Sequence, residues 1–289
     1  MGKLFVVPTP IGNLEDITQR AISVLQTCDL IAAEDTRHTQ KLLNAFNINT
    51  KMISYHKFNE KKRSSELVDR IIRDNINIAL VSDAGTPCIS DPGYEIVKCA
   101  RENGVEVIGI AGASALPIAL SISGIDTKNV AYYGFLSKEK NDRDNQIRDV
   151  MKNPIRTFVL FESPKRVFDL LENINRIMPN VIVCVCNDIT KYYEKSIYGL
   201  VGEVIEVLKS DRFTDKGEYT IVGYKEDYIN EGSKENENIL HSLVFEKIFK
   251  NRCTLKEAIS EIVEEKGLSK NEVYRAALDV KEFLESYDI

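Results

Sequence analysis

Residues 76–93 read INIALVSDAGTPCISDPG, an apolar segment that runs directly into a loop rich in glycine, proline and aspartate. An apolar run without polar alternation, such as Ile78–Val81, is typical of a strand buried on both faces of a parallel sheet. The loop after it carries Asp83, Gly85 and Thr86. Because ligands of open α/β sheets bind beyond the carboxyl ends of strands, we expect an α/β fold with a ligand site at this loop.

Strand and helix patterns alternate through the first 124 residues. Apolar segments predict four further strands, at Leu4–Pro8, Asp29–Glu34, Lys51–His56 and Val105–Ile110. Helical spacing lies between them, including one helix over Leu14–Thr27 and one that we expect Asp91 to cap, with Pro92 at its first position. Five strands separated by helices predict a parallel sheet covered on both faces, as an N-terminal domain over residues 1–124.

Residues 125–224 predict a second α/β domain with a mixed or partly antiparallel sheet. Four segments are expected to be its strands: Val130–Leu136, Arg156–Glu162, Val181–Cys186 and Glu218–Tyr224. The polar, acidic residues 225–238 are typical of a flexible linker.

Residues 239–289 predict a small C-terminal helical module. Two pairs in it match the capping box, in which a hydroxyl and a carboxylate bond the free amides of a helix start: Thr254 with Glu257, and Ser269 with Glu272. Gly267 suits the end of the helix between them. The tight turn resembles a helix-turn-helix, whereas the acidic balance favours a packing domain or a dimer contact.

Composition limits the class of protein. The 289 residues carry a net charge of −6, and no apolar run approaches the roughly 20 residues that a bilayer requires. The N-terminus enters a strand without a secretion signal, so we expect a cytoplasmic protein with no membrane partner. The six cysteines are expected to be small buried side chains, and no metal site is predicted. A nucleic-acid partner would require a local basic patch.

Three loops at predicted strand ends carry residues suited to a ligand. Pro10 and Asn13 belong to the stiff PTPIGN loop after the first strand, which is also compatible with a simple turn into a helix. Ser114 and Ala115 follow the fifth strand, where small side chains leave room for a flat ring. Asp83 can face an ammonium, a sulfonium or a ribose hydroxyl, or else a structural partner. We expect these loops to converge on one crevice.

Several common ligands are disfavoured for that crevice. No G-x-G-x-x-G follows the first strand, which argues against a dinucleotide. The chain also lacks a phosphate-binding G-x-x-x-x-G-K-[ST] loop, paired metal ligands and a serine nucleophile elbow.

Five motifs carry a resemblance to a known family. They are VPTPIGNLEDIT at 7–18, LIAAEDTRHTQKLL at 30–43, ALVSDAGTPCISDPG at 79–93, FESPKR at 161–166 and KGEYTIV at 216–222. In order and spacing they resemble the ribosomal RNA small subunit methyltransferase I family, which has the tetrapyrrole-methylase-like (class III) fold of S-adenosylmethionine enzymes. The resemblance covers nearly the whole chain.

The resemblance implies methylation of the 2′-hydroxyl of a cytidine in the decoding centre of 16S ribosomal RNA. S-adenosylmethionine is the implied cofactor, bound in a cleft that the second domain completes. A homodimer acting on RNA in the small ribosomal subunit is also implied, and DNA is not expected as a partner. The residues that the resemblance assigns to the cofactor are Pro10, Asp83, Gly85, Thr86, Ser114, Ala115, Phe161, Gly217 and Glu218.

Two segments depart from the family pattern. Residues 111–113 read Ala-Gly-Ala where the family has a Pro-Gly-Pro type of turn, and Asn187-Asp188 stand where it often has Arg-Glu.

A charged segment after the second predicted strand suggests substrate contacts. Of its residues, Glu34 and Asp35, together with Asp83, are candidates to accept the proton of a ribose hydroxyl. Arg37 is a candidate to bind a phosphate, although a helix-capping role is favoured for Asp35 by itself. The substrate-binding candidates are Asn13, Arg37, His38, Lys165 and Arg166. Phe58, Tyr132, Tyr133 and Phe135 are candidates for base stacking, although most are expected in the core.

Two other functions remain compatible with these residues. A methyltransferase of the same fold that acts on a tetrapyrrole or another small molecule would need an apolar cavity sized for a macrocycle. An RNA-binding factor without activity would show no affinity for the cofactor.

Overall fold

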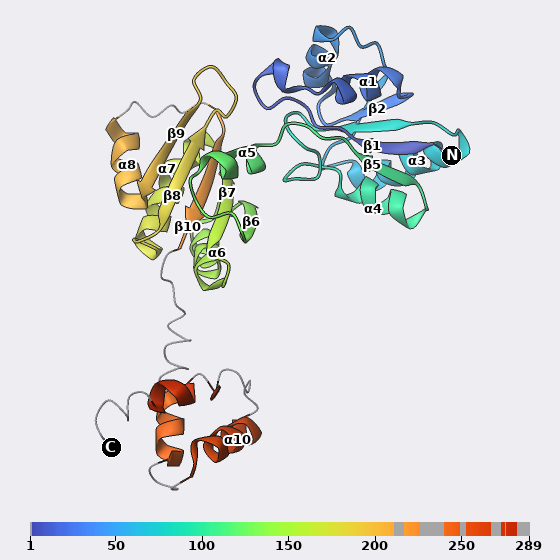
Figure 1. Cartoon of the computed structure of the whole chain (residues 1–289). Coiled ribbons are helices and arrows are strands. Elements are labelled where there is room, and N and C mark those ends of the chain that lie inside the picture. Colours follow the sequence, from blue (N-terminus) through green and yellow to red (C-terminus); the bar gives the residue numbers. More distant parts are fainter. Residues whose placement is uncertain are drawn as a thin grey trace. The chain divides into compact units, whose positions relative to one another are not determined.

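A computed structural model describes residues 2–210, 217–225, 240–248, 253–266, 273–274 and 276–281. The chain divides into two compact units, residues 1–226 and 227–289. The first unit contains both sheets, and the second contains the C-terminal helices (Figure 1).

The first sheet is entirely parallel, as predicted. Its strands are β1 (Lys3–Val6), β2 (Leu30–Ala33), β3 (Met52–Ser54), β4 (Ile78–Val81) and β5 (Glu106–Gly109), in the order β3-β2-β4-β1-β5. All four residues of β2 and of β4 are buried, which confirms that their continuous apolar runs reflect burial on both faces.

Helices cover both faces of this sheet (Figure 1). Leu25 of α1 (Gln19–Thr27) and Leu43 of α2 (Thr36–Ala45) share a core cluster on one face. Ile71 of α3 (Glu60–Arg73) and Ile96 of α4 (Tyr94–Glu102) belong to the cluster on the other. The sheet is therefore the middle of a three-layer first domain.

Two predicted helix starts are wrong. Thr18 caps α1 by accepting the Ala21 amide, so the predicted helix over residues 14–27 is split into a short 3₁₀ turn, Leu14–Asp16, and α1. Helix α4 begins at Tyr94 after Gly93, whose φ of 141° a residue with a side chain rarely adopts. Asp91 and Pro92 thus belong to the loop after β4, and Asp91 does not cap the helix.

The second sheet is mixed, as predicted. Its strands are β6 (Val130–Phe135), β7 (Thr157–Glu162), β8 (Ile182–Asn187), β9 (Lys195–Leu200) and β10 (Tyr219–Tyr224), in the order β6-β7-β10-β8-β9. β6 and β7 are parallel, and the other neighbours are antiparallel. The edge strand β9 was not predicted. Helices α6 (Lys140–Lys152), α7 (Pro164–Ile177) and α8 (Val201–Ser210) pack side by side in this domain.

Helix α5 (Ala115–Ile122) links the two sheets. It follows β5 of the first sheet, but its Ala119 shares a core cluster with Val159 and Val222 of the second. The helix therefore fixes the carboxyl end of β5 beside the second sheet. The boundary at residue 124 stays a prediction.

The second unit has its own apolar core, described here for helical residues 240–248, α10 (Leu255–Lys266) and helical residues 276–281. The first predicted capping box is confirmed: the Thr254 amide donates to Glu257 Oε2 at 2.8 Å, and the Glu257 amide donates to Thr254 Oγ1 at 3.4 Å. The second box, Gly267 and nearly all of the predicted linker lie outside the described residues. No helix in the described part of the chain is long and apolar enough to span a membrane.

The cysteines are free thiols. Cys28, Cys184 and Cys186 are buried as expected, and the other three are half-buried. Cys184 and Cys186 lie on one face of β8 with their Sγ atoms 3.8 Å apart.

Candidate functional site

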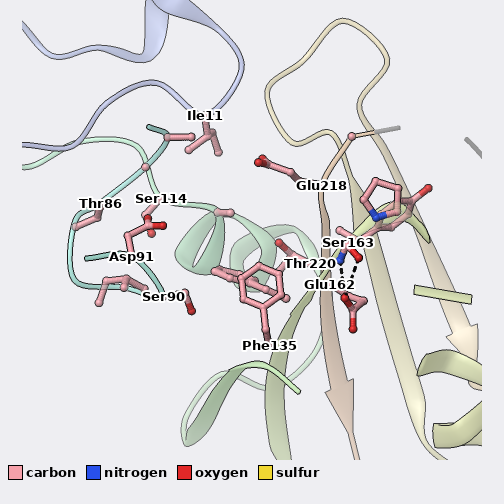
Figure 2. Close-up of a pocket in the computed structure, with 18 residues that line it drawn as sticks. Ile11, Thr86, Ser90, Asp91, Ser114, Phe135, Glu162, Ser163, Glu218 and Thr220 are labelled. Atoms are coloured by element: carbon pink, nitrogen blue, oxygen red, sulfur yellow. Dashed lines mark hydrogen bonds between the residues drawn. The ribbon is translucent and has the colours of Figure 1, made fainter. Parts of the chain in front are cut away.

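A cavity of about 300 Å³ lies between the loops of the first sheet and the strand ends of the second. From the first domain it is lined by residues 84–86, 89–91, 114 and 115 and by Ile11, and from the second by Phe135, residues 161–164 and residues 217–220. Figure 2 shows Thr86, Asp91 and Ser114 on one side of this space and Glu218, Ser163 and Thr220 on the other. Its volume lies at the lower end of the range typical of small-molecule sites.

Hydrogen bonds tie the three predicted loops together. Thr9 and Gly85 exchange both backbone hydrogen bonds at 2.9 Å, which joins the loop after β1 to the loop after β4. Thr86 Oγ1 donates to the Ala113 carbonyl at 3.1 Å, which joins the β4 loop to the loop after β5. The expected convergence of these loops is therefore confirmed.

Two glycines let the backbone line the cavity closely. Gly85 has a φ of 80°, in the left-handed region that favours glycine. Gly217 has a φ of 92°, and a Cβ on it would lie 2.4 Å from Asp188 Oδ1. A side chain at either position would strain or displace the cavity wall.

Among the carboxyls that line the cavity, Asp91 has the pKa that is shifted most from its ordinary value. Burial and, to a smaller degree, the nearby negative charges of Glu34, Asp83 and Glu218 raise its pKa to about 7, against a hydrogen bond with Ser82 that lowers it. A carboxyl in this state is costly to ionise without a partner. A cationic ligand in the cavity would supply that partner.

Glu34, Asp35 and Asp83 form a connected group beside the cavity. The Asp83 amide donates to Glu34 Oε2 at 3.3 Å, and the Asp35 amide donates to Asp83 Oδ1 at 3.0 Å. Burial raises the pKa of Glu34, which suits a proton acceptor. Asp35 instead caps α2 and binds Arg37 through both oxygens at 3.2 and 2.8 Å, which holds its pKa well below the ordinary value. This arrangement favours the capping role for Asp35.

The second domain provides an aromatic wall and a charged edge. The ring of Phe161 packs edge-to-face against Tyr132, with centroids 5.3 Å apart, and against Phe135 at 5.8 Å. Glu218 lies 3.9 Å from Lys191 Nζ. Ser90 of the first domain bonds the Tyr132 hydroxyl, so the two walls are in direct contact. Among the residues that the structure describes, no group of His, Cys, Asp and Glu side chains could hold a metal ion.

Comparison with known proteins identifies the family. Residues 3–205 match the family described as tetrapyrrole (corrin/porphyrin) methylases. The chain is 40% identical over 282 residues to the ribosomal RNA small subunit methyltransferase I of Escherichia coli O157:H7, an alignment that covers 96% of this chain and 95% of that protein. It is 37% identical to the protein of the same name from Bacillus subtilis strain 168, over 96% and 94% of the two chains. The chain belongs to the tetrapyrrole methylase family, among its ribosomal RNA small subunit methyltransferase I members.

Two solved structures share the fold. A diphthine synthase matches with a TM-score of 0.60 at 14% identity, over 76% of this chain and 89% of that one. The uroporphyrin-III C-methyltransferase of Thermus thermophilus, solved with S-adenosyl homocysteine, matches with a TM-score of 0.53 at 16% identity, over 76% and 97%. The two-domain α/β fold expected from the sequence is therefore confirmed.

Seven of the nine residues assigned to the cofactor line the cavity: Gly85, Thr86, Ser114, Ala115, Phe161, Gly217 and Glu218. The other two, Pro10 and Asp83, line a smaller adjoining hollow of about 150 Å³ together with His38. The roles of all nine remain proposals.

The substrate-binding candidates are dispersed. Asn13 caps the 3₁₀ turn, accepting the Glu15 amide at 3.1 Å, and Lys165 is exposed on α7. Arg166 donates to the carbonyls of Leu136 and Ser137 at 3.0 and 2.9 Å and pairs with Glu162 at 3.1 Å. Its guanidinium therefore holds the loop after β6, a structural role that the sequence reading did not anticipate.

Asp91 lines the cavity, whereas its sequence pattern predicted a helix cap. The pattern Ser-Asp-Pro-Gly at 90–93 matched a helix cap, but it was also next to the predicted ligand loop. Ile11, Phe135, Glu162 and Thr220 also line the cavity without having been assigned to the cofactor. Thr220 and Glu162 are polar residues near strand ends, and this position is the signal by which the sequence could have assigned them to the cavity.

Proposed function

We propose that this protein transfers a methyl group from S-adenosylmethionine to the 2′-hydroxyl of a cytidine in small-subunit ribosomal RNA. The observation that carries the proposal is the cavity, in which residues of four of the five family motifs meet carboxyls that suit a cation. The near full-length relatives named ribosomal RNA small subunit methyltransferase I support the RNA substrate.

The cavity fits the chemistry of the cofactor. The small side chains of Ser114 and Ala115 leave space for a flat purine, and Ile11 and Phe161 provide apolar contacts. Asp91 and Glu218 suit the positive charges of the amino acid end and the sulfonium. Bound S-adenosylmethionine supplies an electrophilic methyl group, so the protein has to align the acceptor and exclude water.

Among Glu34, Asp35 and Asp83, Glu34 is the carboxyl best suited to accept the proton. Its pKa is raised, and the backbone amide of Asp83 fixes the orientation of one of its oxygens. Asp83 in turn holds the Asp35 amide, so it acts as a positioning residue for this segment. Asp35 is committed to Arg37 and to the helix start, which leaves it poorly suited to accept a proton.

The finer assignments of target and assembly also belong to the proposal. We assign the methylation to the decoding centre of 16S RNA, within a cytoplasmic small ribosomal subunit and by a homodimer, on the resemblance of the sequence to its family. On the RNA side, Lys165 and Phe58 are exposed and suited to backbone and base contacts. Tyr132 and Tyr133 are instead bonded within the protein, to Ser90 and Asn153.

The test incubates small subunits that lack this methylation with the purified protein and cofactor labelled in the methyl group, and then maps the modified nucleotide. Label on one cytidine ribose supports the proposal, whereas label on another nucleotide, on a base or on no RNA contradicts it. Calorimetry with S-adenosylmethionine separates an inactive RNA-binding factor, which binds no cofactor, from an enzyme. In single-turnover assays, we expect Glu34→Gln to lower the rate about 10²- to 10⁴-fold, the range of general base catalysis.

A further inference from the structure

Two adjacent tyrosines in the turn between β8 and β9 are strongly exposed. Tyr192 is 92% exposed and Tyr193 is 74% exposed. Their rings contact each other edge-to-face, with centroids 4.8 Å apart. Exposed aromatic side chains that gather in one place commonly mark a binding surface.

The turn that carries these rings is held rigidly. The Thr190 amide donates to Glu194 Oε2 at 2.7 Å, and Lys191 Nζ lies 2.8 Å from Asp188 Oδ1. Backbone hydrogen bonds from Lys191 to Asp188 and from Glu194 to Lys191 close the turn. Because the support is ordered in advance, a ligand that contacts the rings loses little of its binding free energy to ordering the backbone.

The turn adjoins the cavity on both of its walls. The Asp188 amide donates to the carbonyl of Glu218, a cavity residue, at 3.1 Å. The side chain of Lys191 lies against Gly12, where a Cβ would be only 2.3 Å from Lys191 Cγ, and Gly12 follows the cavity residue Ile11. The two tyrosines therefore follow, within a few residues along the chain, side chains and backbone that contact the cavity walls.

We propose that Tyr192 and Tyr193 form a stacking platform for unpaired RNA bases next to the methylated ribose. This inference rests on the proposed function and adds the class of substrate to it, namely a single-stranded segment. Proteins recognise unpaired RNA by stacking bases on aromatic rings, because every base has a flat apolar face. Bases held on the platform position the neighbouring ribose at the cavity and keep the segment from pairing.

The surroundings of the rings favour RNA over a second copy of the chain. Lys191 and Glu194 flank the pair, and exposed Lys195 begins β9 two residues after Tyr193. The centre of a stable protein interface is depleted of such charged residues. Exposed tyrosine rings on such a turn instead suit the flat faces of unpaired bases.

The absence of tryptophan from the chain makes a direct test available. Tyr192→Trp introduces a single indole, whose fluorescence is quenched when a base stacks on it. With cofactor bound, titration with a single-stranded oligonucleotide of the target sequence is expected to quench the emission, and the same oligonucleotide annealed to its complement is expected to leave it unchanged. Equal quenching by both, or none by either, overturns the proposal.

A loss-of-stacking variant provides the second arm. Tyr192→Ala combined with Tyr193→Ala is expected to raise the KM for RNA about tenfold or more, since stacking contributes roughly 1–3 kcal/mol per base. Affinity for S-adenosylmethionine, measured by calorimetry, should stay unchanged, which also shows that the variant is folded. Tyr198→Ala, which removes a 58% exposed tyrosine farther along β9, is the matched control and should keep the wild-type KM.

The outcomes separate this inference from the function on which it rests. If the wild-type protein methylates RNA and the double variant keeps its KM, the platform is refuted and the methyltransferase proposal stands. If the double variant instead loses self-association in sedimentation and keeps its KM, the rings form an interface between copies, and the inference is also refuted. If the wild-type protein methylates no RNA, the proposed function fails first.

Discussion

Replacing Asp91 by asparagine should uncouple cofactor binding from pH. The Asp91 carboxyl has a pKa of about 7 because it is buried among other carboxyls, so about a tenth of it is ionised at pH 6 and about nine-tenths at pH 8. A bound cation favours the ionised form. The affinity of the wild-type protein for S-adenosylmethionine should therefore rise with pH through 7, and Asp91→Asn removes the group that titrates.

The expected size follows from one charge-assisted hydrogen bond. If the ionised carboxyl contributes about 2 kcal/mol, the variant binds about 30-fold more weakly at pH 8. Because the protonated wild-type carboxyl resembles an amide, the ratio of the two dissociation constants should fall to about twofold at pH 5.5. Calorimetric titrations of both proteins from pH 5.5 to 8 measure this ratio, in which the titration of the ligand itself cancels.

The same substitution is expected to raise the stability of the protein at high pH, whereas it weakens cofactor binding there. The pKa of Asp91 is higher in the folded protein than in the unfolded chain, so wild-type stability without ligand falls as pH rises from about 4 to about 7. Asparagine has no proton to lose, and Asp91→Asn should melt at a higher temperature than wild type at pH 8 and at a similar temperature near pH 4. A ratio of dissociation constants that is independent of pH, or a variant less stable at pH 8, would refute the electrostatic account of this cavity.

Three further predictions concern other residues. Lys225→Met should lower the free energy of unfolding by about 2–3 kcal/mol in urea titrations, because the buried ammonium donates to three carbonyls at the end of α6; an unchanged midpoint would contradict this. Gly217→Ala should lower both stability, by roughly 1–2 kcal/mol, and cofactor affinity, since its φ is positive and its Cβ would meet Asp188; calorimetry and unfolding curves check both. Asp35→Asn should leave the single-turnover rate near that of wild type while Glu34→Gln lowers it, and equal losses would return Asp35 to the catalytic set.

The parallel sheet was predictable because its signal is local. A strand buried on both faces needs only apolar residues, and Ile78–Val81 has nothing else. The edge strand β9 lacks that signal, since most of its side chains are exposed and its position depends on pairing with β8. The start of α4 was misplaced for a different reason. Asp91 and Pro92 are typical of a helix start, but the left-handed Gly93 ends the cavity loop first.

The loops of the site were predictable and the electrostatics of its side chains were not. Strand ends, glycines and small residues identify Gly85 and Ser114 from the sequence, because topology brings the carboxyl ends of parallel strands together. The raised pKa of Asp91 arises first from burial and then from the charges of Glu34, Asp83 and Glu218, which are 57, 8 and 127 residues away in the chain. Arg166 was misread because its partners lie on other elements: Glu162 ends β7, and the carbonyls of Leu136 and Ser137 follow β6.

The carboxyls around the cavity also bear on how charge is balanced during the proposed transfer. Burial and the negative charges of Glu34, Asp83 and Glu218 raise the pKa of Asp91, so ionisation of Asp91 in the cavity is unfavourable. A bound sulfonium would offset one of these charges, and transfer of its methyl group to a neutral hydroxyl would remove that positive charge. Glu34 becomes neutral when it takes up the hydroxyl proton, so one positive and one negative charge are lost together. The net charge is the same before and after transfer whichever carboxylate takes up the proton, so the choice rests on the pKa, which burial raises for Glu34 and the hydrogen bonds with Arg37 hold low for Asp35.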